Sequence, residues 1–344
     1  MERAITKKHI LFVVNPISGL STKKIILKQI EKDIDRDRYT YEVVYTEYAG
    51  HATEIARNAA NRGIDIVCAV GGDGTVNEIA RALVHTETSL AIIPSGSGNG
   101  LARHLHVPVD TLRAIKVLNE GQLQSIDYGL VNLQPFFCTC GIGFDALISQ
   151  KFAESGKRGP LTYIENVLQT VVKYNADNYE IELEDEHAEH FSFKALLIAC
   201  ANASQYGNNA YIAPHASVRD GLLDVMILEP FNVLEAPTMA LQLMNGTIDR
   251  NSHIKMFRCR KLTIRRKNSG VIHYDGDPID MGEVIEVSII KGGLSCVCPK
   301  SEGLRNMGAT LQNHVLEFYN TVFLHSEDVV LNTARHLTMK DRTS

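Results

Sequence analysis

A glycine-rich turn between a buried strand and a helix is the feature that most constrains this chain. Residues 66–70 form an apolar run typical of a buried parallel strand, and residues 71–78 follow with the sequence GGDGTVNE. A helical apolar pattern continues through residue 83. A strand that ends in glycines and continues as a helix presents free backbone N–H groups where phosphate binds. An ordinary tight turn accounts for the spacing as well, since glycine is common in turns.

Asp73 is the unexpected residue in this turn, because it places a carboxylate where phosphates would bind. Such a pairing is expected mainly when a divalent cation lies between the two anions. Asp73 is therefore a candidate metal ligand, and a simple polar turn residue is the alternative interpretation.

The first part of the chain alternates strands with helices. Strands are predicted at residues 9–14, 39–46, 66–70 and 90–94, and helices from about residue 21 and at 50–62, 76–83 and 111–119. Short joins between these elements predict a doubly wound parallel α/β domain. Loops rich in small residues follow three of the strands, at 15–19, 71–75 and 95–100. Because ligands bind beyond the carboxyl ends of such strands, these loops are expected to meet at one site.

Other phosphate-binding motifs are disfavoured by their spacing. The chain contains no GxxxxGK[ST] sequence, which argues against a P-loop ATPase. Residues 96–100 read GSGNG and lack the GxGxxG spacing, and no convincing acidic residue follows about 20 residues later. A dinucleotide-binding dehydrogenase is therefore a weak alternative.

The pattern changes to short strands near residue 123. Strands are predicted at 125–132, 135–141, 179–183, 191–199, 222–228, 254–265, 270–274 and 284–290, with helices at 161–174 and 232–244. Many short strands separated by turns predict an antiparallel β-sandwich. We therefore predict an α/β domain with the phosphate-binding loops at 1–123, a β-sandwich domain at 124–299, and a substrate site in the cleft between them.

The last residues, 303–344, have a helical apolar pattern and are predicted to form a tail that joins the first domain. Its apolar face is expected to pack on the chain's own core or on a second subunit of a homodimer. The alternative is a face that lies on a membrane, against which the lack of a basic cluster argues.

Composition excludes several classes of function. The net charge of −5 gives no basic surface for nucleic acid, and no apolar run approaches the roughly 20 residues of a membrane helix. The seven cysteines show no CxxC spacing, and the N-terminus leads directly into a strand without a secretion signal. We expect a reduced, cytoplasmic protein.

Six motifs together resemble one family. They are Asn15-Pro16-x-x-Gly19, residues 71–78, Pro94-x-Gly96-Ser97-Gly98-Asn99, Gly141-x-Gly143-Phe144-Asp145-Ala146, Asp220-Gly221-x-Leu223-Asp224-Val225 and Asp275-Gly276-Asp277. In this order they are similar to the catalytic domain of diacylglycerol and sphingosine kinases, and in particular to the soluble bacterial lipid kinases of that family. The resemblance covers roughly residues 9–299.

The resemblance implies phosphoryl transfer from ATP, with Mg²⁺, to a lipid hydroxyl. The residues that it assigns to the nucleotide are Asn15, Pro16, Gly19, Thr46, Gly71, Gly72, Asp73, Gly74, Thr75, Asn77, Glu78, Ser97, Gly98, Asn99 and Asp277. Asp73 would also hold the catalytic Mg²⁺. Glu78 is expected to orient the loop rather than to touch the substrate.

The resemblance also implies that Asp275 is the general base, which takes the proton of the attacking hydroxyl. A type I turn is the alternative interpretation of Asp275-Gly276. Asp277 stands where the family usually has glutamate, so its carboxylate is one methylene shorter. Asp145 is a candidate contact of the acceptor's polar head.

A second, structural Mg²⁺ is implied at Asp220 with the carbonyl groups of Ser217 and Leu222. The acceptor is expected to be diacylglycerol or a sphingoid base, presented at a membrane surface that the protein touches transiently, on the inner side of the membrane. Two alternatives remain open, a kinase for a soluble acceptor such as NAD and an inactive regulator that binds nucleotide or lipid.

Overall fold

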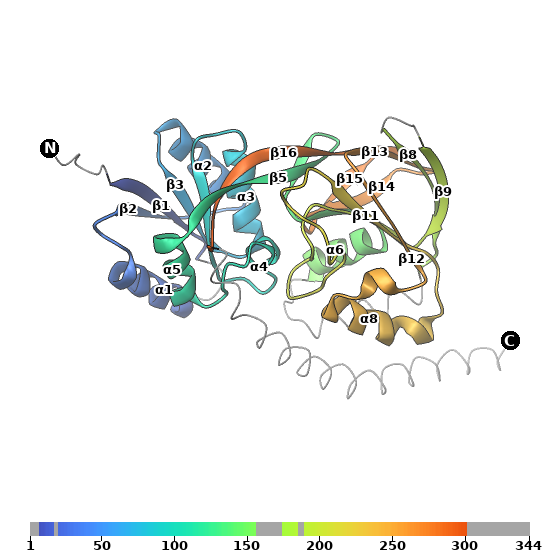
Figure 1. The fold of residues 1–344 in the computed structure, drawn as a ribbon, viewed down its shortest axis with the longest axis horizontal. Helices are drawn as coiled ribbons and strands as arrows, with labels where there is room; N and C mark the ends of the chain where they lie inside the picture. The colour runs from blue at the N-terminus through green and yellow to red at the C-terminus, as the bar shows by residue number, and fades with distance from the viewer. Residues whose placement is uncertain (1–6, 17–19, 156–173, 185–188, 301–344) are drawn as a thin grey trace.

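The computed structural model describes residues 7–16, 20–155, 174–184 and 189–300. Two lobes are joined by strands that run through both of them (Figure 1). The predicted tail and nearly all of the helix predicted at 161–174 lie outside the described residues.

The first lobe is a parallel α/β domain, as predicted. Its strands have the order β2-β1-β3-β4 and pair in parallel. They are β1 (Lys8–Val14), β2 (Tyr39–Tyr45), β3 (Ile66–Gly71) and β4 (Ser89–Pro94). The helices are α1 (Leu20–Asp33), α2 (His51–Asn61), α3 (Asp73–Leu83), α4 (Gly100–His104) and α5 (Thr111–Glu120). Every residue of β3 and β4 is buried, because α1 and α5 cover one face of the sheet while α2 and α3 cover the other (Figure 1).

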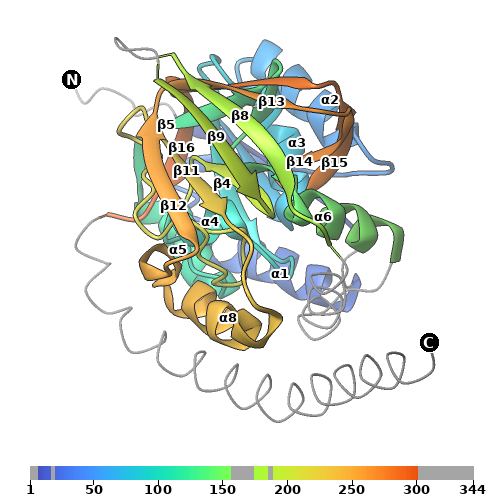
Figure 2. The same cartoon turned by 90° about the vertical axis from the view of Figure 1, so that its right-hand side faces the viewer.

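The second lobe is an antiparallel β-sandwich, which confirms the predicted fold class. One of its sheets has the order β12-β11-β10-β7-β14-β15, and the other contains β16, β13, β8 and β9 with β5 and β6 beside β16. Their bounds are β5 (Gln122–Val131), β6 (Gln134–Phe136), β7 (Thr139–Gly143), β8 (Asp177–Leu183), β9 (Glu189–Ala195), β10 (Leu197–Ala201), β11 (Leu223–Leu228), β12 (Ile254–Cys259), β13 (Lys261–Arg266), β14 (Gly270–Tyr274), β15 (Asp277–Met281) and β16 (Val284–Cys298). Figure 2 shows this lobe facing the viewer, with α8 (Ala236–Asn245) below the strands.

Three of the predicted strands are each two strands, one in each sheet. The runs 135–141, 191–199 and 254–265 divide into β6 and β7, β9 and β10, and β12 and β13. The prediction of single strands is wrong here because a chain that crosses from one sheet to the other stays extended and apolar. Helix α6 (Phe144–Ser155), which packs on β14 and β15, and strand β15 were also not predicted.

Strand β16 extends eight residues beyond its predicted end at residue 290 and connects the lobes. The glycines at 292 and 293 form a bulge between Ile290 and Leu294, with Gly292 at φ 62°, after which pairing with β5 resumes. The last residues of β16 then lie beside β4, with Cys296 opposite Leu90. The sheet of the first lobe is thus continuous with one sheet of the sandwich.

Candidate active site

Two of the glycine-rich loops touch through their backbones. A Cβ atom placed on Gly96 would lie 2.5 Å from the Gly72 Cα, and one on Gly72 would lie 3.1 Å from the Gly96 Cα. The Ser95 N–H donates to the Gly71 carbonyl at 2.8 Å. Only glycine permits this approach, so the loops after β3 and β4 form one surface at the carboxyl edge of the sheet.

Asp73 fastens these loops together. It begins α3, and its carboxylate accepts the backbone N–H groups of Asn99 at 2.8 Å and Gly100 at 2.6 Å. Burial raises the pKa of Asp73, and these hydrogen bonds oppose that shift. A carboxylate has about four lone-pair positions, so Asp73 keeps acceptor capacity for a cation or a ligand.

Further predicted nucleotide residues surround this contact. The Asn15 side chain donates to the Thr75 hydroxyl at 3.3 Å. Asn99, in the left-handed region at φ 53°, closes its loop by bonding the N–H and carbonyl of Gly96, which leaves Ser97 exposed at the tip. The structure therefore brings the loops after β1, β3 and β4 together.

The remaining predicted nucleotide residues have more peripheral or structural places. Glu78 accepts the backbone N–H groups of Gly50 and Ala52 at 2.9 and 3.1 Å and so fastens the start of α2 to α3. Thr46 follows β2 and is buried, as is Asn77 in α3. Gly19 lies outside the described residues.

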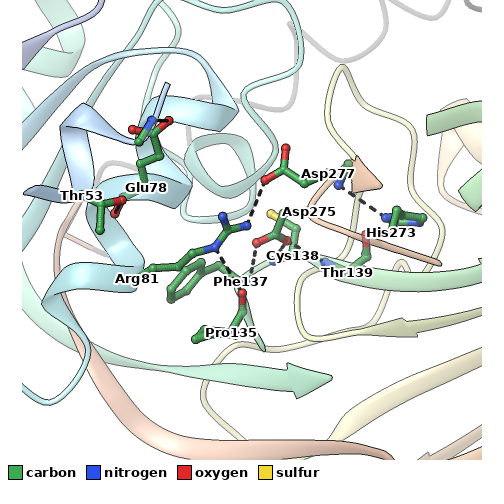
Figure 3. Close-up of polar contacts among 12 residues, drawn as sticks. Thr53, Glu78, Arg81, Pro135, Phe137, Cys138, Thr139, His273, Asp275 and Asp277 are labelled. Atoms are coloured by element: carbon green, nitrogen blue, oxygen red, sulfur yellow. Dashed lines mark hydrogen bonds and ion pairs between the residues drawn. The ribbon is translucent and has the colours of Figure 1, made fainter. Parts of the chain in front are cut away.

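Asp275 lies in a hairpin turn of the second lobe. Asp275 and Gly276 connect β14 to β15 with φ values of 53° and 86°, the two positive angles of a type I′ turn rather than a type I turn. The Asp275 carboxylate accepts the backbone N–H groups of Phe137 at 2.8 Å, Cys138 at 2.7 Å and Thr139 at 3.2 Å (Figure 3). The carboxylate is thereby held in one orientation.

Burial raises the pKa of Asp275 to about 6, while these three amides and the Arg81 charge oppose the shift. Such a carboxylate is ionised at neutral pH and is a stronger base than an exposed aspartate. Both properties suit a group that must accept a proton.

Arg81 reaches this turn from the first lobe (Figure 3). Its guanidinium forms an ion pair with Asp277 at 3.1 Å and lies 4.6 Å from the centre of the Tyr274 ring. The sequence reasoning missed Arg81. The spacing of residues 73, 77 and 81 could have indicated it, because residues four apart lie on the same face of α3 as Asp73.

The two carboxylates lie on either side of one short contact between the lobes. Cys138 donates its N–H to Asp275, and its sulfur would lie 3.4 Å from a Cβ on Gly100. The N–H of Gly100 is in turn donated to Asp73. Asp73 and Asp275, about 200 residues apart in the chain, thus belong to one site.

A loop of the second lobe covers the third glycine-rich loop, and the sequence reasoning missed it. Gly207 lies against Gly98, and the Asn208 N–H donates to the Gly98 carbonyl at 2.8 Å. Arg103 donates to the side chain of Asn209 at 3.2 Å. These contacts are made by glycine and asparagine residues with no motif of their own.

Asp145 is buried beside the hairpin. It accepts a hydrogen bond from the Tyr206 hydroxyl at 3.2 Å and lies 3.1 Å from Nε2 of His273. The Gly276 N–H points at the other ring nitrogen of His273 at 3.4 Å. The predicted contact of Asp145 with the acceptor's polar head stays a prediction.

The residues predicted for a structural metal precede β11, which β10 and β7 separate from β14 in the same sheet. Asp220 forms an ion pair with Arg258 and accepts the Leu222 N–H at 3.1 Å. Within the part of the chain that the structure describes, no group of three or more His, Cys, Asp or Glu side chains could hold a metal ion. The assignment of Ser217, Asp220 and Leu222 to Mg²⁺ stays a prediction.

Each of the two lobes matches one family model. Residues 9–131 match the diacylglycerol kinase catalytic domain, and residues 138–294 match the YegS C-terminal NAD kinase beta sandwich-like domain. The chain thus combines these two domains, which confirms the resemblance seen in its motifs.

Similar proteins are named as lipid kinases, and a solved structure shares the fold. The chain is 28% identical over 275 residues to a diacylglycerol kinase of Bacillus subtilis strain 168, covering 78% of this chain and 90% of the relative. It is 26% identical to "Probable lipid kinase YegS-like" of Yersinia pseudotuberculosis serotype I, covering 85% and 97%. A crystal structure titled as a diacylglycerol kinase from Bacillus anthracis str. Sterne shares the fold, with a TM-score of 0.67, 18% identity and coverage of 86% and 98%. In the described ranges no helix is long and apolar enough to cross a bilayer.

Proposed function

We propose that this protein is an ATP-dependent lipid kinase that transfers the γ-phosphoryl group to a lipid hydroxyl, with Mg²⁺ and with Asp275 as general base. The observation that carries the proposal is the contact through Gly100 and Cys138, which places Asp73 and its glycine-rich loops beside the Asp275 hairpin. The family match supports the reaction class.

The nucleotide side of the reaction belongs to the first lobe. The backbone N–H groups of residues 71–75 at the start of α3 favour the phosphates, and Ser97 is exposed for a further hydrogen bond. Mg²⁺ is usually held by one or two carboxylates together with substrate phosphates, so a single carboxylate at Asp73 fits it. Bound there, the ion would neutralise charge on the transferring phosphoryl group.

The chemical step belongs to the hairpin of the second lobe. The acceptor hydroxyl oxygen forms a bond to the γ-phosphorus while the bond from that phosphorus to the ADP oxygen breaks. The hydroxyl proton passes to the carboxylate of Asp275, which is ionised above about pH 6. Asp277 and Arg81 lie at the same turn, where they hold the hairpin against α3.

We propose a diacylglycerol or a sphingoid base as acceptor, presented at the inner surface of a membrane. Relatives named diacylglycerol kinase and YegS-like lipid kinase support this acceptor class. The description of the second domain as NAD kinase beta sandwich-like makes NAD the soluble acceptor to exclude.

The test is transfer from isotope-labelled ATP into a panel of lipids in mixed micelles, read by mass spectrometry, with NAD in a separate reaction. We expect Mg²⁺-dependent labelling of one lipid class, and loss of labelling in folded Asp73→Ala protein. Labelling of NAD alone would replace the lipid with a soluble acceptor. Tight ATP binding without transfer to any acceptor would indicate an inactive regulator.

A further inference from the structure

Lys23 is a buried lysine that the proposed reaction leaves without a role. It lies near the start of α1, and only 2% of its surface is exposed. Its ammonium donates to the Val70 carbonyl at 3.2 Å and to the Ser95 hydroxyl. Val70 lies in β3 directly before Gly71, the last residue of that strand, and Ser95 begins the loop after β4. The ammonium therefore lies where both loops start.

The positive charge of Lys23 has no negative partner in the described ranges. Both of its hydrogen-bond acceptors are neutral, and no carboxylate of the described residues forms an ion pair with it. Burial lowers the pKa of Lys23 to about 8. Burying an unpaired ammonium costs free energy, so such a group is expected to gain a counter-ion when the protein binds its ligand.

We propose that Lys23 is a phosphate-binding residue of the nucleotide site. An ammonium has three N–H donors, of which two are used by Val70 and Ser95, so the third can donate to a phosphate oxygen. The charge lies beside loops that also carry the Asp73 carboxylate, where the phosphates of ATP need cations besides Mg²⁺. This inference rests on the proposed function.

The nearby cation Arg103 does not replace Lys23. Its guanidinium donates to the Gly98 carbonyl and the Asn209 side chain, at the side of the third loop that faces the second lobe. Lys23 approaches the same loops from α1. The phosphates would therefore have a fixed positive charge on the first-lobe side, independent of the position of the second lobe.

The test compares Lys23→Gln with Lys24→Gln. A glutamine amide can still donate to Val70 and Ser95 but carries no charge, and Lys24 is an exposed neighbour on the same helix. Calorimetric titration with ATP, ADP and adenosine gives the affinity of each ligand. We expect Lys23→Gln to weaken ATP and ADP by about 10- to 100-fold and to leave adenosine unchanged, because only phosphate loses a charged hydrogen bond. Lys24→Gln should bind all three ligands like the wild type.

Three results would overturn the assignment. ATP affinity equal to wild type in Lys23→Gln would remove Lys23 from the site while leaving the proposed kinase intact. Equal losses for ATP and adenosine would mean that Lys23 only supports the fold. Absence of ATP binding in the wild-type protein would end both the assignment and the proposed function. Lysine ¹³Cε NMR of the wild type is a second readout, since ATP but not adenosine should shift the signal that Lys23→Arg removes.

Discussion

Asp73 and Asp275 are both carboxylates held by backbone N–H groups, but the two are placed by different means. Asp73 receives its amides from residues 26 and 27 positions away, within the same lobe. Asp275 receives its three from residues 136 to 138 positions earlier, and its own backbone is in the left-handed region. The first arrangement follows from a local motif, whereas the second exists only after the sandwich has formed.

The difference also separates binding from chemistry. The first-lobe loops offer glycine backbone, N–H groups and one carboxylate, which suit a phosphate chain. The hairpin offers a carboxylate with a pKa of about 6, which suits proton transfer. Substitutions in the first-lobe loops should therefore weaken ATP binding, whereas substitutions in the hairpin should slow phosphoryl transfer.

The largest expected effect is on turnover in Asp275→Asn. We expect kcat to fall by about 100- to 10,000-fold, because an amide of the same shape cannot accept the hydroxyl proton. Initial rates of lipid phosphorylation measure this effect, and circular dichroism checks that the variant is folded. Asp280→Asn, an exposed change in the same hairpin, is the control and should leave the rate unchanged. Turnover in Asp275→Asn within about twofold of wild type would remove the base assignment.

The second prediction concerns the free energy of unfolding, which depends on the close contact between Gly72 and Gly96. Gly96→Ala should lower the free energy of unfolding by about 1–3 kcal/mol, because the new methyl group meets the Gly72 backbone. Gly74→Ala is the matched change, since its Cβ meets nothing within 4 Å. It should leave the free energy unchanged or raise it by up to about 1 kcal/mol. Urea unfolding measures both values, and equal effects would contradict the close loop contact.

The pH dependence of kcat/KM is the third prediction. Burial raises the pKa of Asp275 from 3.8 to about 6, so the carboxylate is protonated and inactive at pH 5 and ionised at pH 7. We expect kcat/KM to rise with pH through a midpoint near 6, measured in micelles of fixed composition. A midpoint near 4 would mean that an ordinary exposed carboxylate takes the proton.

The raised pKa of Asp275 changes the stability of the protein in the direction opposite to its effect on kcat/KM. Since the folded pKa of Asp275 lies above the unfolded value, the folded protein binds more protons between pH 4 and 6. The free energy of unfolding contributed by this group is therefore greatest below pH 3.8 and is lost as pH rises through about 6. Unfolding curves of wild type and Asp275→Asn over this range should diverge accordingly.

The smallest expected effect is that of Arg81→Met. Arg81 lowers the pKa of Asp275, so its removal should move the kcat/KM midpoint to higher pH, by less than about one unit. The free energy of unfolding should change by about 1 kcal/mol or less, because the ion pair with Asp277 is half exposed. Arg57→Met on α2 is the exposed control. A midpoint that moves to lower pH would contradict the proposed influence of Arg81.

The parts of the fold that sequence predicted are those in which local pattern decides the outcome. The run 66–83 contains a buried strand, its glycines and its helix. The glycine-rich turn could therefore be predicted from this run alone, without knowledge of the segments that pack against it. The parallel order and the meeting of three loops then follow from the alternation of strands and helices. The fold class and the nucleotide side could therefore be predicted.

The remainder depends on long-range contacts that periodicity does not record. An extended run shows neither which sheet it joins nor that it changes sheet, which is why 191–199 and 254–265 were each predicted as one strand. The amides at 137–139 and the guanidinium of Arg81 become visible only when the hairpin is placed between the lobes. Lys23 is one lysine in a mixed helix until the fold buries it.

The most direct test of the central claim measures ATP affinity and single-turnover phosphoryl transfer in the same proteins. The claim is that the first-lobe loops bind the nucleotide and the hairpin carries the chemistry. It predicts that Asp275→Asn binds ATP within about twofold of wild type but transfers almost no phosphate, whereas Gly96→Ala loses ATP affinity. An equal loss of ATP affinity in both variants, or transfer at the wild-type rate in Asp275→Asn, would contradict it.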